Sequence, residues 1–249
     1  TGRLSQASEQ LAAVRSHAEQ LGHPYSVAQT CQIAAWHYCV REDLAECLEW
    51  AGRLKDMATQ HGMGMFHDIA DILVFWSKGR MGQFKQAAEH IDEIAARMFQ
   101  TGAQLAVGTI ASLIADCAIR SGAIDVGHKA LDRALSQTHS EEQLYKPELL
   151  RLRAELNHMQ EPCNPRISED LNRAIVCANE QGATLFALRA ATQLAAIQTA
   201  KKDRLQAASM VKKCLAEVLE PADIIVIRTA KLISAQYSST TLSKKEIGP

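Results

Sequence analysis

The chain has 249 residues, of which 47% are hydrophobic, 22% charged and only 5% aromatic, and 27 Lys and Arg against 28 Asp and Glu give a formal charge of -1. A near-neutral chain lacks the basic face that phosphate contacts require, which argues against direct nucleic-acid contact by this chain. No apolar run approaches the roughly 18 residues of a membrane span, and the polar first ten residues do not resemble a signal peptide. Abundant alanine with few Pro (6) and Gly (13) indicates helices and makes a β-rich protein a poor fit.

Turn signals divide the chain at a regular interval. Gly22, Gly62, Gly102 and Gly182 each follow a long helical pattern, as a left-handed residue at a helix C-terminus does, and their separations are 40, 40 and 80 residues. A second series of turns, at residues 41–43, 79–82, 120–122, 162–165 and 201–203, recurs at about the same interval. Two interleaved series of breaks predict two helices per repeat, and therefore a tandem array of helical hairpins.

The expected helices fall into two types. The second helix of each hairpin has an apolar stripe of period 3.6, whereas the first is apolar on more of its circumference and should be the more buried partner. In chain order we expect helices over residues 3–21, 26–40, 44–58, 66–78, 84–98, 105–120, 124–135, 147–159, 167–178, 184–200, 205–218 and 222–237.

The end helices, 3–21 and 222–237, lack a hairpin partner, so we expect a piece of a longer protein. Residues 1–237 would form a single all-α domain of about five hairpins plus these end helices, and residues 238–249 a flexible tail.

The seven cysteines show no pairing pattern. They stand at positions 31, 39, 47, 117, 163, 177 and 214, without any Cys-x-x-Cys pair and mostly at apolar positions of helical segments. A secreted disulfide framework would need paired cysteines on loops. We therefore predict reduced, buried thiols and a cytoplasmic location.

Several stretches resemble a known architecture. Residues 34–38 (Ala-Ala-Trp-His-Tyr), residues 42–44 (Glu-Asp-Leu) and the small residues at helix contacts are similar to tetratricopeptide (TPR) repeats, although the repeat is about 40 residues long instead of about 34. Residues 145–156 and 178–195 resemble the C-terminal TPR-like region of large bacterial signalling proteins. Those proteins carry a winged-helix or adenylyl-cyclase domain and an ATPase module before this region. A more distant likeness is to the sugar-sensing superhelix of the bacterial maltose-regulon activator.

The resemblance covers roughly residues 45–235 and implies a right-handed superhelix with a sensing or protein-binding role in signal transduction or transcription regulation. The output chemistry would belong to other domains. In the family a turn with an aromatic residue and a glycine usually follows Leu219, whereas this chain has Glu-Pro-Ala-Asp at residues 220–223, which leaves the register of the last helix open.

Catalytic motifs are missing from the sequence. It contains no phosphate-binding loop, no dinucleotide-binding glycine motif, no nucleophile elbow and no His-Glu-x-x-His, so we predict no enzyme activity, no catalytic residue and no cofactor. The loop at residues 61–67 carries two His and two Met, which are ligand types for copper(I) or zinc. An ordinary connection between repeats explains this loop better, and we expect no metal site.

The first helices are the better place for a binding groove, because in such arrays they generally line the inner face. Trp36 and Trp76 are one repeat apart, and Asp116 continues their column as a charge. Arginines on these helices would suit a carboxylate or phosphate ligand. The alternatives are packing between hairpins for the tryptophans and internal ion pairs for the arginines, for instance of Arg153 or Arg189 with Glu148 or Glu155. The groove candidates are Trp36, Trp76, Asp116, Arg120, Arg153, Arg189 and Gln193.

Two functions compete at this point. The first is a non-enzymatic sensor domain that binds a protein, a peptide or a small effector in the groove. The second is a protein–protein scaffold or homodimerisation module without a small ligand, which uses the last helix. Its self-association candidates are Ile224, Ile227 and Leu232.

Overall fold

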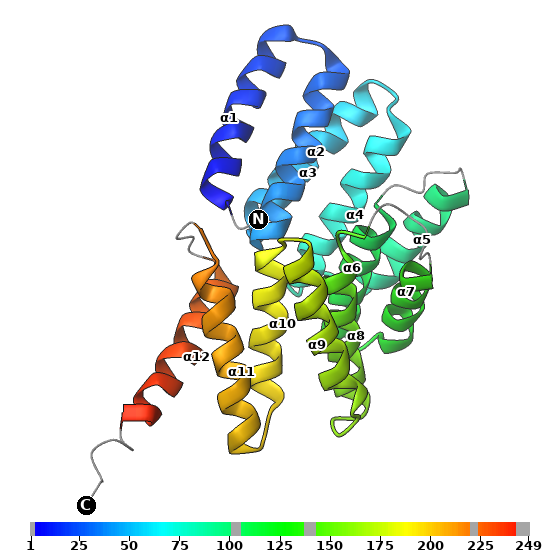
Figure 1. Ribbon diagram of the computed structural model, residues 1–249. Helices are drawn as coiled ribbons and strands as arrows, with labels where there is room; N and C mark the ends of the chain where they lie inside the picture. Colours follow the sequence, from blue (N-terminus) through cyan, green and yellow to red (C-terminus); the bar gives the residue numbers. More distant parts are fainter. Residues whose placement is uncertain (1–2, 101–105, 137–142, 220–223, 243–249) are drawn as a thin grey trace, which may run out of the picture. The chain divides into compact units, whose positions relative to one another are not determined.

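A computed structural model of the chain describes residues 3–100, 106–136, 143–219 and 224–242, with side chains up to Tyr237 (Figure 1). Within these ranges the chain forms twelve helices and no strand, which confirms the all-α prediction. The helices are α1 (Leu4–Leu21), α2 (Pro24–Arg41), α3 (Leu44–Gln60), α4 (Gly64–Arg80), α5 (Ala87–Gln100), α6 (Val107–Ser121), α7 (Ile124–Ser136), α8 (Lys146–Gln160), α9 (Arg166–Glu180), α10 (Thr184–Ile197), α11 (Lys201–Ala216) and α12 (Ile225–Leu242).

Left-handed residues end the helices at regular positions. Apart from Ala106, which precedes α6, the described residues with a positive backbone φ are separated by multiples of 20 residues: Gly22, Glu42, Gly62, Gly82, Gly122 and Gly182. The two predicted series of turns are therefore one series, with one helix per interval. The predicted stop at Gly102 lies outside the described residues.

Two predicted turns are misplaced by a few residues. The turn expected at residues 201–203 lies earlier, because α10 ends at Ile197 and α11 already begins at Lys201. Asp203 then falls in the first turn of α11, where a carboxylate interacts favourably with the helix dipole. Similarly, Gly79 belongs to α4 and not to the turn that follows it.

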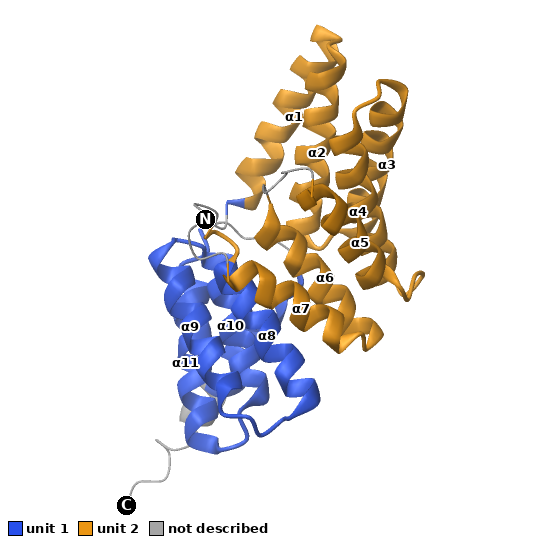
Figure 2. Cartoon of the chain, turned by 90° about the vertical axis from the view of Figure 1, so that its right-hand side faces the viewer, with its two compact units in different colours: residues 1–3, 146–249 blue, residues 4–145 orange. Residues whose placement is uncertain are grey.

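The helices pack into two compact units, Leu4–Tyr145 and Lys146–Pro249, the latter with Thr1–Arg3 (Figure 2). In each unit, every helix packs on the next one in the chain, and alternate helices form a row. The row consists of α2, α4 and α6 in the first unit and of α8, α10 and α12 in the second. The boundary between the units lies at Tyr145, within the range expected to form one domain, and the single domain over residues 1–237 stays a prediction.

Helices α6, α8 and α10 of these rows are buried most completely, as predicted for the first helices, whereas α2 and α12 are buried no more than the second-type helices. Every residue from Val107 to Ala115 in α6 is buried, whereas α7 buries only Gly127, Ala130 and Leu131. The contacts are lined with alanine: Ala34, Ala70, Ala115 and Ala190 are inaccessible to solvent. Small side chains let the helix backbones approach closely, which explains the alanine-rich composition.

The last helix differs from its prediction. Ile224 and Ile227, expected on an exposed face, are only 5% and 2% exposed, because this side of α12 packs on α10 and α11. Leu232 is 71% exposed, as expected. The helix continues to Leu242, so the predicted tail is shorter at its start, and residues 243–249 lie outside the described part. None of the described helices is both long and apolar enough to span a bilayer.

Gly79 marks a close approach between three helices. A Cβ atom at this position would lie 2.6 Å from the Cβ of Ala87 and 3.1 Å from the Sγ of Cys117. Gly52, inside α3, has no neighbouring atom within 4 Å of such a Cβ. Packing therefore requires a glycine at position 79. At position 52 there is room for a side chain, and glycine only weakens the helix.

We expect Gly79→Ala to lower the free energy of unfolding by about 1–2 kcal/mol, because the overpacking penalty exceeds the gain in helix propensity. The matched control, Gly52→Ala, should raise it by up to about 1 kcal/mol. Urea unfolding followed by circular dichroism measures both. Equal stabilisation by the two alanines would show that α4 does not approach α5 and α6 as described.

Candidate functional site

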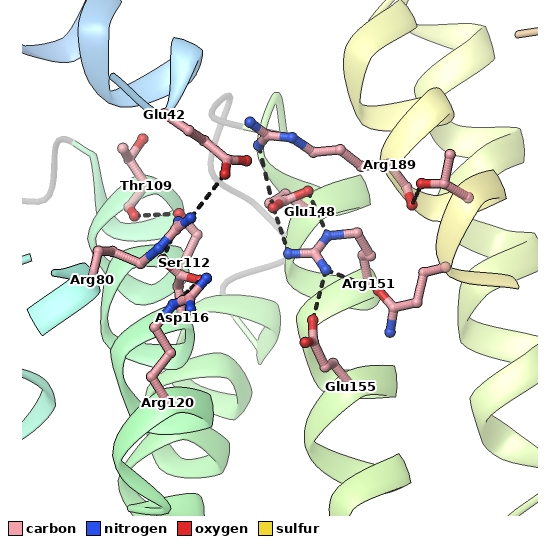
Figure 3. Close-up of polar contacts among 12 residues, drawn as sticks. Glu42, Arg80, Thr109, Ser112, Asp116, Arg120, Glu148, Arg151, Glu155 and Arg189 are labelled. Carbon is pink, nitrogen blue, oxygen red and sulfur yellow. Dashed lines mark hydrogen bonds and ion pairs between the residues drawn. The ribbon is translucent and has the colours of Figure 1, made fainter. Parts of the chain in front are cut away.

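The predicted groove residues lie mostly in two charge clusters, one in each unit (Figure 3). The α4–α6 cluster consists of Glu42, Trp76, Arg80, Asp116 and Arg120. The α8–α10 cluster consists of Glu148, Arg151, Glu155, Arg189 and Gln193. Each cluster joins successive helices of one row, so the repeat places these residues together although they are about 40 residues apart in sequence.

Arg80 is the centre of the α4–α6 cluster. Its Nη1 donates to Asp116 Oδ2 at 2.9 Å and its Nη2 to Glu42 Oε2 at 2.8 Å. Burial alone would lower the pKa of this guanidinium, but the two carboxylates raise it above its usual value, so Arg80 is a permanent cation. It thereby ties α4 to α6 and to the end of α2.

Trp76 uses the same acceptor. Its Nε1 donates to Asp116 Oδ2 at 2.8 Å, and the Arg80 guanidinium lies 5.5 Å from its ring centroid. Because Trp76 is only 2% exposed, it is a packing residue and not an open stacking surface. Trp36 is half-buried on α2, and among the described residues no ring contact joins it to Trp76. The predicted pair of indoles is therefore wrong, whereas the step of one repeat from Trp76 to Asp116 is a real contact.

Glu42 occupies a backbone conformation that favours glycine. Its φ is 59°, and the equivalent residues one and two repeats later are Gly82 and Gly122. A left-handed conformation costs a non-glycine residue about 1–2 kcal/mol. Here the side chain uses the position for its ion pair with Arg80, an interaction that glycine would not provide. Sequence reasoning treated Glu42 as part of a turn only and missed this contact.

Arg120 is the outward member of the α4–α6 cluster. Its Nε lies 3.9 Å from Asp116 Oδ1, and its side chain is 47% exposed. An exposed pair at this distance contributes little to stability.

The α8–α10 cluster is organised by Arg151, which the sequence analysis missed. Arg151 donates to both oxygens of Glu148, at 2.9 and 3.0 Å, and at 2.8 Å to Glu155 and to Gln193 Oε1. Arg189 lies 3.5 Å from Glu148 Oε1, which is the internal ion pair considered as an alternative for it. Two guanidiniums face two carboxylates, so the cluster has no net charge. Each of its charged side chains forms an ion pair with another member of the cluster.

Glu148 is held ionised inside this cluster. Burial alone would raise its pKa, but the guanidiniums of Arg151 and Arg189 hold the pKa of its carboxyl below its usual value. A carboxylate with a lowered pKa stabilises the fold above its unfolded-state pKa of about 4.3, and this contribution is lost as the pH falls through the folded-state value.

Arg153 forms an internal ion pair, as the alternative expectation had it, but with Asp170 and not with the carboxylates named as examples. Its Nε and Nη2 donate to the two oxygens of Asp170 at 2.8 and 2.7 Å, and Asp170 is only 5% exposed. The pair joins α8 to α9 inside one hairpin. Arg153 therefore does not present its guanidinium to a ligand, and its partner is neither Glu148 nor Glu155.

A hollow in the first unit, here named the Trp50 pocket, has a lining that combines aromatic, cationic and apolar groups. It has a volume of about 300 Å³ between α1, α2 and α3. Its apolar lining comes from Ala18, Val27, Cys31, Trp50 and Met57, and its charged lining from Arg15, Glu19, Arg53 and Asp56, with Thr30 completing the wall.

Trp50 and two arginines give the pocket its chemical character. The guanidinium carbons of Arg53 and Arg15 lie 4.6 and 5.8 Å from the Trp50 ring centroid. Both side chains are about half exposed, at 52% and 47%, and their ion pairs with Glu49 and Glu19 are of the weak surface kind. The cations can therefore exchange these partners for an anionic ligand.

The thiol of Cys31 lines the same pocket. It is 5% exposed, and burial raises its pKa, so the thiol is protonated and acts as part of the apolar wall. Cys39, Cys47, Cys117 and Cys214 are also buried, whereas Cys163 is exposed and Cys177 half-buried. All seven are free thiols, as predicted, but the predicted burial is wrong for Cys163 and Cys177.

The Trp50 pocket was missed because its three parts come from three helices. Arg53 follows Trp50 by three residues and so shares its helix face, a signal the sequence does contain. The contribution of Arg15 depends on how α1 packs. Among the described residues, no group of three His, Cys, Asp or Glu side chains is arranged to hold a metal ion.

Comparisons with known proteins do not identify a function for the chain. No model of a protein family matches the chain, and no curated protein matches it.

We expect Glu148→Gln to lower the free energy of unfolding by about 3 kcal/mol at neutral pH, because it leaves two buried guanidiniums with less compensation. The difference from the wild type should shrink as the pH falls from the unfolded-state pKa of about 4.3 through the lower folded-state pKa, below which Glu148 is protonated in both states. Glu155→Gln is the matched control. Glu155 contacts the same Arg151 but is 38% exposed, so its loss should cost under about 1 kcal/mol. Chemical unfolding at several pH values measures the effect, and a pH-independent difference would contradict the assignment.

Proposed function

We propose that this chain is a non-enzymatic regulatory domain of the helical-repeat class, which binds a small anionic effector in the Trp50 pocket. The observation that carries the proposal is the pairing of a nearly buried indole with two half-exposed guanidiniums around a hollow of about 300 Å³. This volume is at the lower end of those typical of small-molecule sites, which combine apolar walls with a few polar groups.

The lining supports a particular ligand class. The indole of Trp50 and the side chains of Val27 and Met57 suit a flat apolar body. Arg15 and Arg53 suit a carboxylate, because guanidinium binds it through two parallel hydrogen bonds. We therefore infer an aromatic or cyclic carboxylate of modest size, in place of a ligand held by Trp36, Trp76 and the arginines of the first helices.

The arrangement of the helices supports the remaining features of the proposal. The regular interval of 20 residues and the packing of alternate helices in rows support a TPR-like array with a lengthened repeat, and we propose that the helices within each unit follow a right-handed superhelical course. In such a domain, α1 is the element whose position a ligand would fix, because it supplies Arg15, Ala18 and Glu19 to the pocket. We place this regulatory domain in the cytoplasm, with the output chemistry in another domain or protein.

Binding of 2-naphthoate tests the proposed site. A ligand of this size should bind with a Kd of about 1 mM, given about 0.3 kcal/mol per non-hydrogen atom. It should quench tryptophan fluorescence in the wild type and not in Trp50→Phe, which keeps Trp36 and Trp76. Arg15→Gln combined with Arg53→Gln should weaken binding about tenfold, since hydrogen bonds to charged groups contribute roughly 1.5–3 kcal/mol.

Two controls separate specific from general binding. The neutral analogue 2-naphthamide should bind the wild type more weakly than 2-naphthoate and should be insensitive to the arginine substitutions. Arg97→Gln, on α5 outside the pocket and 62% exposed, should leave naphthoate binding unchanged. Equal binding of the acid and the amide would overturn the proposed anion site.

A further inference from the structure

One helix of the first unit has an uncovered apolar side. At the backbone level α1 packs only on α2 among the described helices, and in Figures 1 and 2 it is the outermost helix of its unit. A second hollow, of about 430 Å³, lies between α1 and α2 and is named here the α1–α2 groove. Its walls include Val14, Leu21, Tyr25 and Ile33, which are 47%, 71%, 52% and 47% exposed.

The repeat shows what normally covers such a surface. One interval of 40 residues after Val14 and Ile33 lie Leu54 and Leu73, which are both 0% exposed. After a second interval come Ile94 and Leu113, both 5% exposed. In the first case α2 packs on both α3 and α4. In the second, the equivalent helix α4 packs on both α5 and α6, as α7 also does. The α1–α2 groove is therefore the surface that a first-type helix of the array covers.

The other end of the chain carries a helix of this type. α12 packs on α10 and α11, as the third member of the row α8, α10 and α12, and no described second-type helix follows it. Its outer face exposes Ile225 (51%) and Leu232 (71%). These residues are seven apart and so lie two turns apart on one side of the helix. Together with the four groove residues they are six of the twelve exposed large hydrophobics among the described residues.

The charges of the two helices are also complementary. α1 contains Glu9 and Glu19 against Arg15, which gives a net charge of -1 with neutral histidine. α12 contains Arg228 and Lys231 and no acidic residue, which gives +2. Opposite net charges favour productive encounter between the two surfaces.

We propose that α12 of one copy of this chain binds in the α1–α2 groove of a second copy, so that copies associate head to tail. The docked helix takes the place, relative to α1 and α2, that α2 occupies relative to α3 and α4. Such a contact joins two different surfaces and leaves a free groove and a free α12 at the ends of every open assembly. The proposal rests on other observations than the Trp50 pocket does, although Ala18 and Thr30 line both hollows.

Two complementary variants test this geometry. The groove variant is Val14→Glu with Ile33→Glu, and the helix variant is Ile225→Gln with Leu232→Glu. All four side chains are about half exposed or more, so the folds should survive, which circular dichroism checks. Val176→Glu on α9, 57% exposed and outside both surfaces, is the matched control.

Sedimentation equilibrium from micromolar to near-millimolar concentration gives the readout. The mass of the wild type and of Val176→Glu should rise with concentration, whereas each double variant alone should associate at least about tenfold more weakly. An equimolar mixture of the two variants should form a one-to-one dimer and stop there, because only one intact groove meets one intact α12.

Other results would overturn the proposal. A symmetric groove-to-groove dimer predicts that the helix variant still dimerises alone, and that the mixture gains nothing. A wild type that remains monomeric over the whole range, or a mixture that does not associate, excludes head-to-tail docking of a second copy. Loss of naphthoate binding with normal association, or the reverse, distinguishes a failure of the effector site from a failure of this interface.

Discussion

The close contact between successive first helices of the hairpins is the constraint on which the rest of the structure depends. Ala34, Ala70 and Ala115 are fully or almost fully buried along the row of α2, α4 and α6, and Gly79 leaves no room for a methyl group beside Ala87 and Cys117. Small side chains set a short distance between helix axes. This distance brings residues one repeat apart within reach of a single hydrogen bond, as Trp76 and Asp116 show.

The two charge clusters are consequences of that spacing. Arg80 reaches Glu42 and Asp116, and Arg151 reaches Gln193, because each pair of helices in a row is close enough for one side chain to bridge it. In each cluster two guanidiniums face two carboxylates. A neutral, mutually bonded set of this kind fixes how one repeat sits on the next, and it holds few groups that a ligand can recruit. The arginines of these clusters, a residue type that suggests an anion-binding groove, therefore bond to neighbouring helices and fix how successive helices of a row align.

Helix α1 is the exception to this packing, and both proposed surfaces lie against it. Ala18 and Thr30 line the Trp50 pocket as well as the α1–α2 groove, so the two hollows lie on opposite sides of the same contact. α1 buries little apart from Leu4 and Ala18, and Ser8 is hydrogen-bonded to His37 at 2.9 Å near its N-terminal end. A helix held by so few contacts can shift at low cost.

The amino-acid sequence by itself determined the elements and their order. The spacing of Gly22, Gly62 and Gly182, the apolar stripes and the abundance of alanine were enough to predict helical hairpins, because helix ends and amphipathic periodicity are local properties of a chain. Turn positions failed only where, as at Gly79 and Lys201, the sequence signal lies within the helix.

The tertiary structure alone decided the partner of each charged and aromatic side chain. Arg153 bonds to Asp170 and not to a neighbour on its own helix, Trp76 is buried, and Ile224 and Ile227 face inward. A shift of one or two residues in helix register rotates a side chain by 100° or more, so periodicity cannot specify these contacts. The Trp50 pocket is subject to the same limit, because it exists only where α1, α2 and α3 converge.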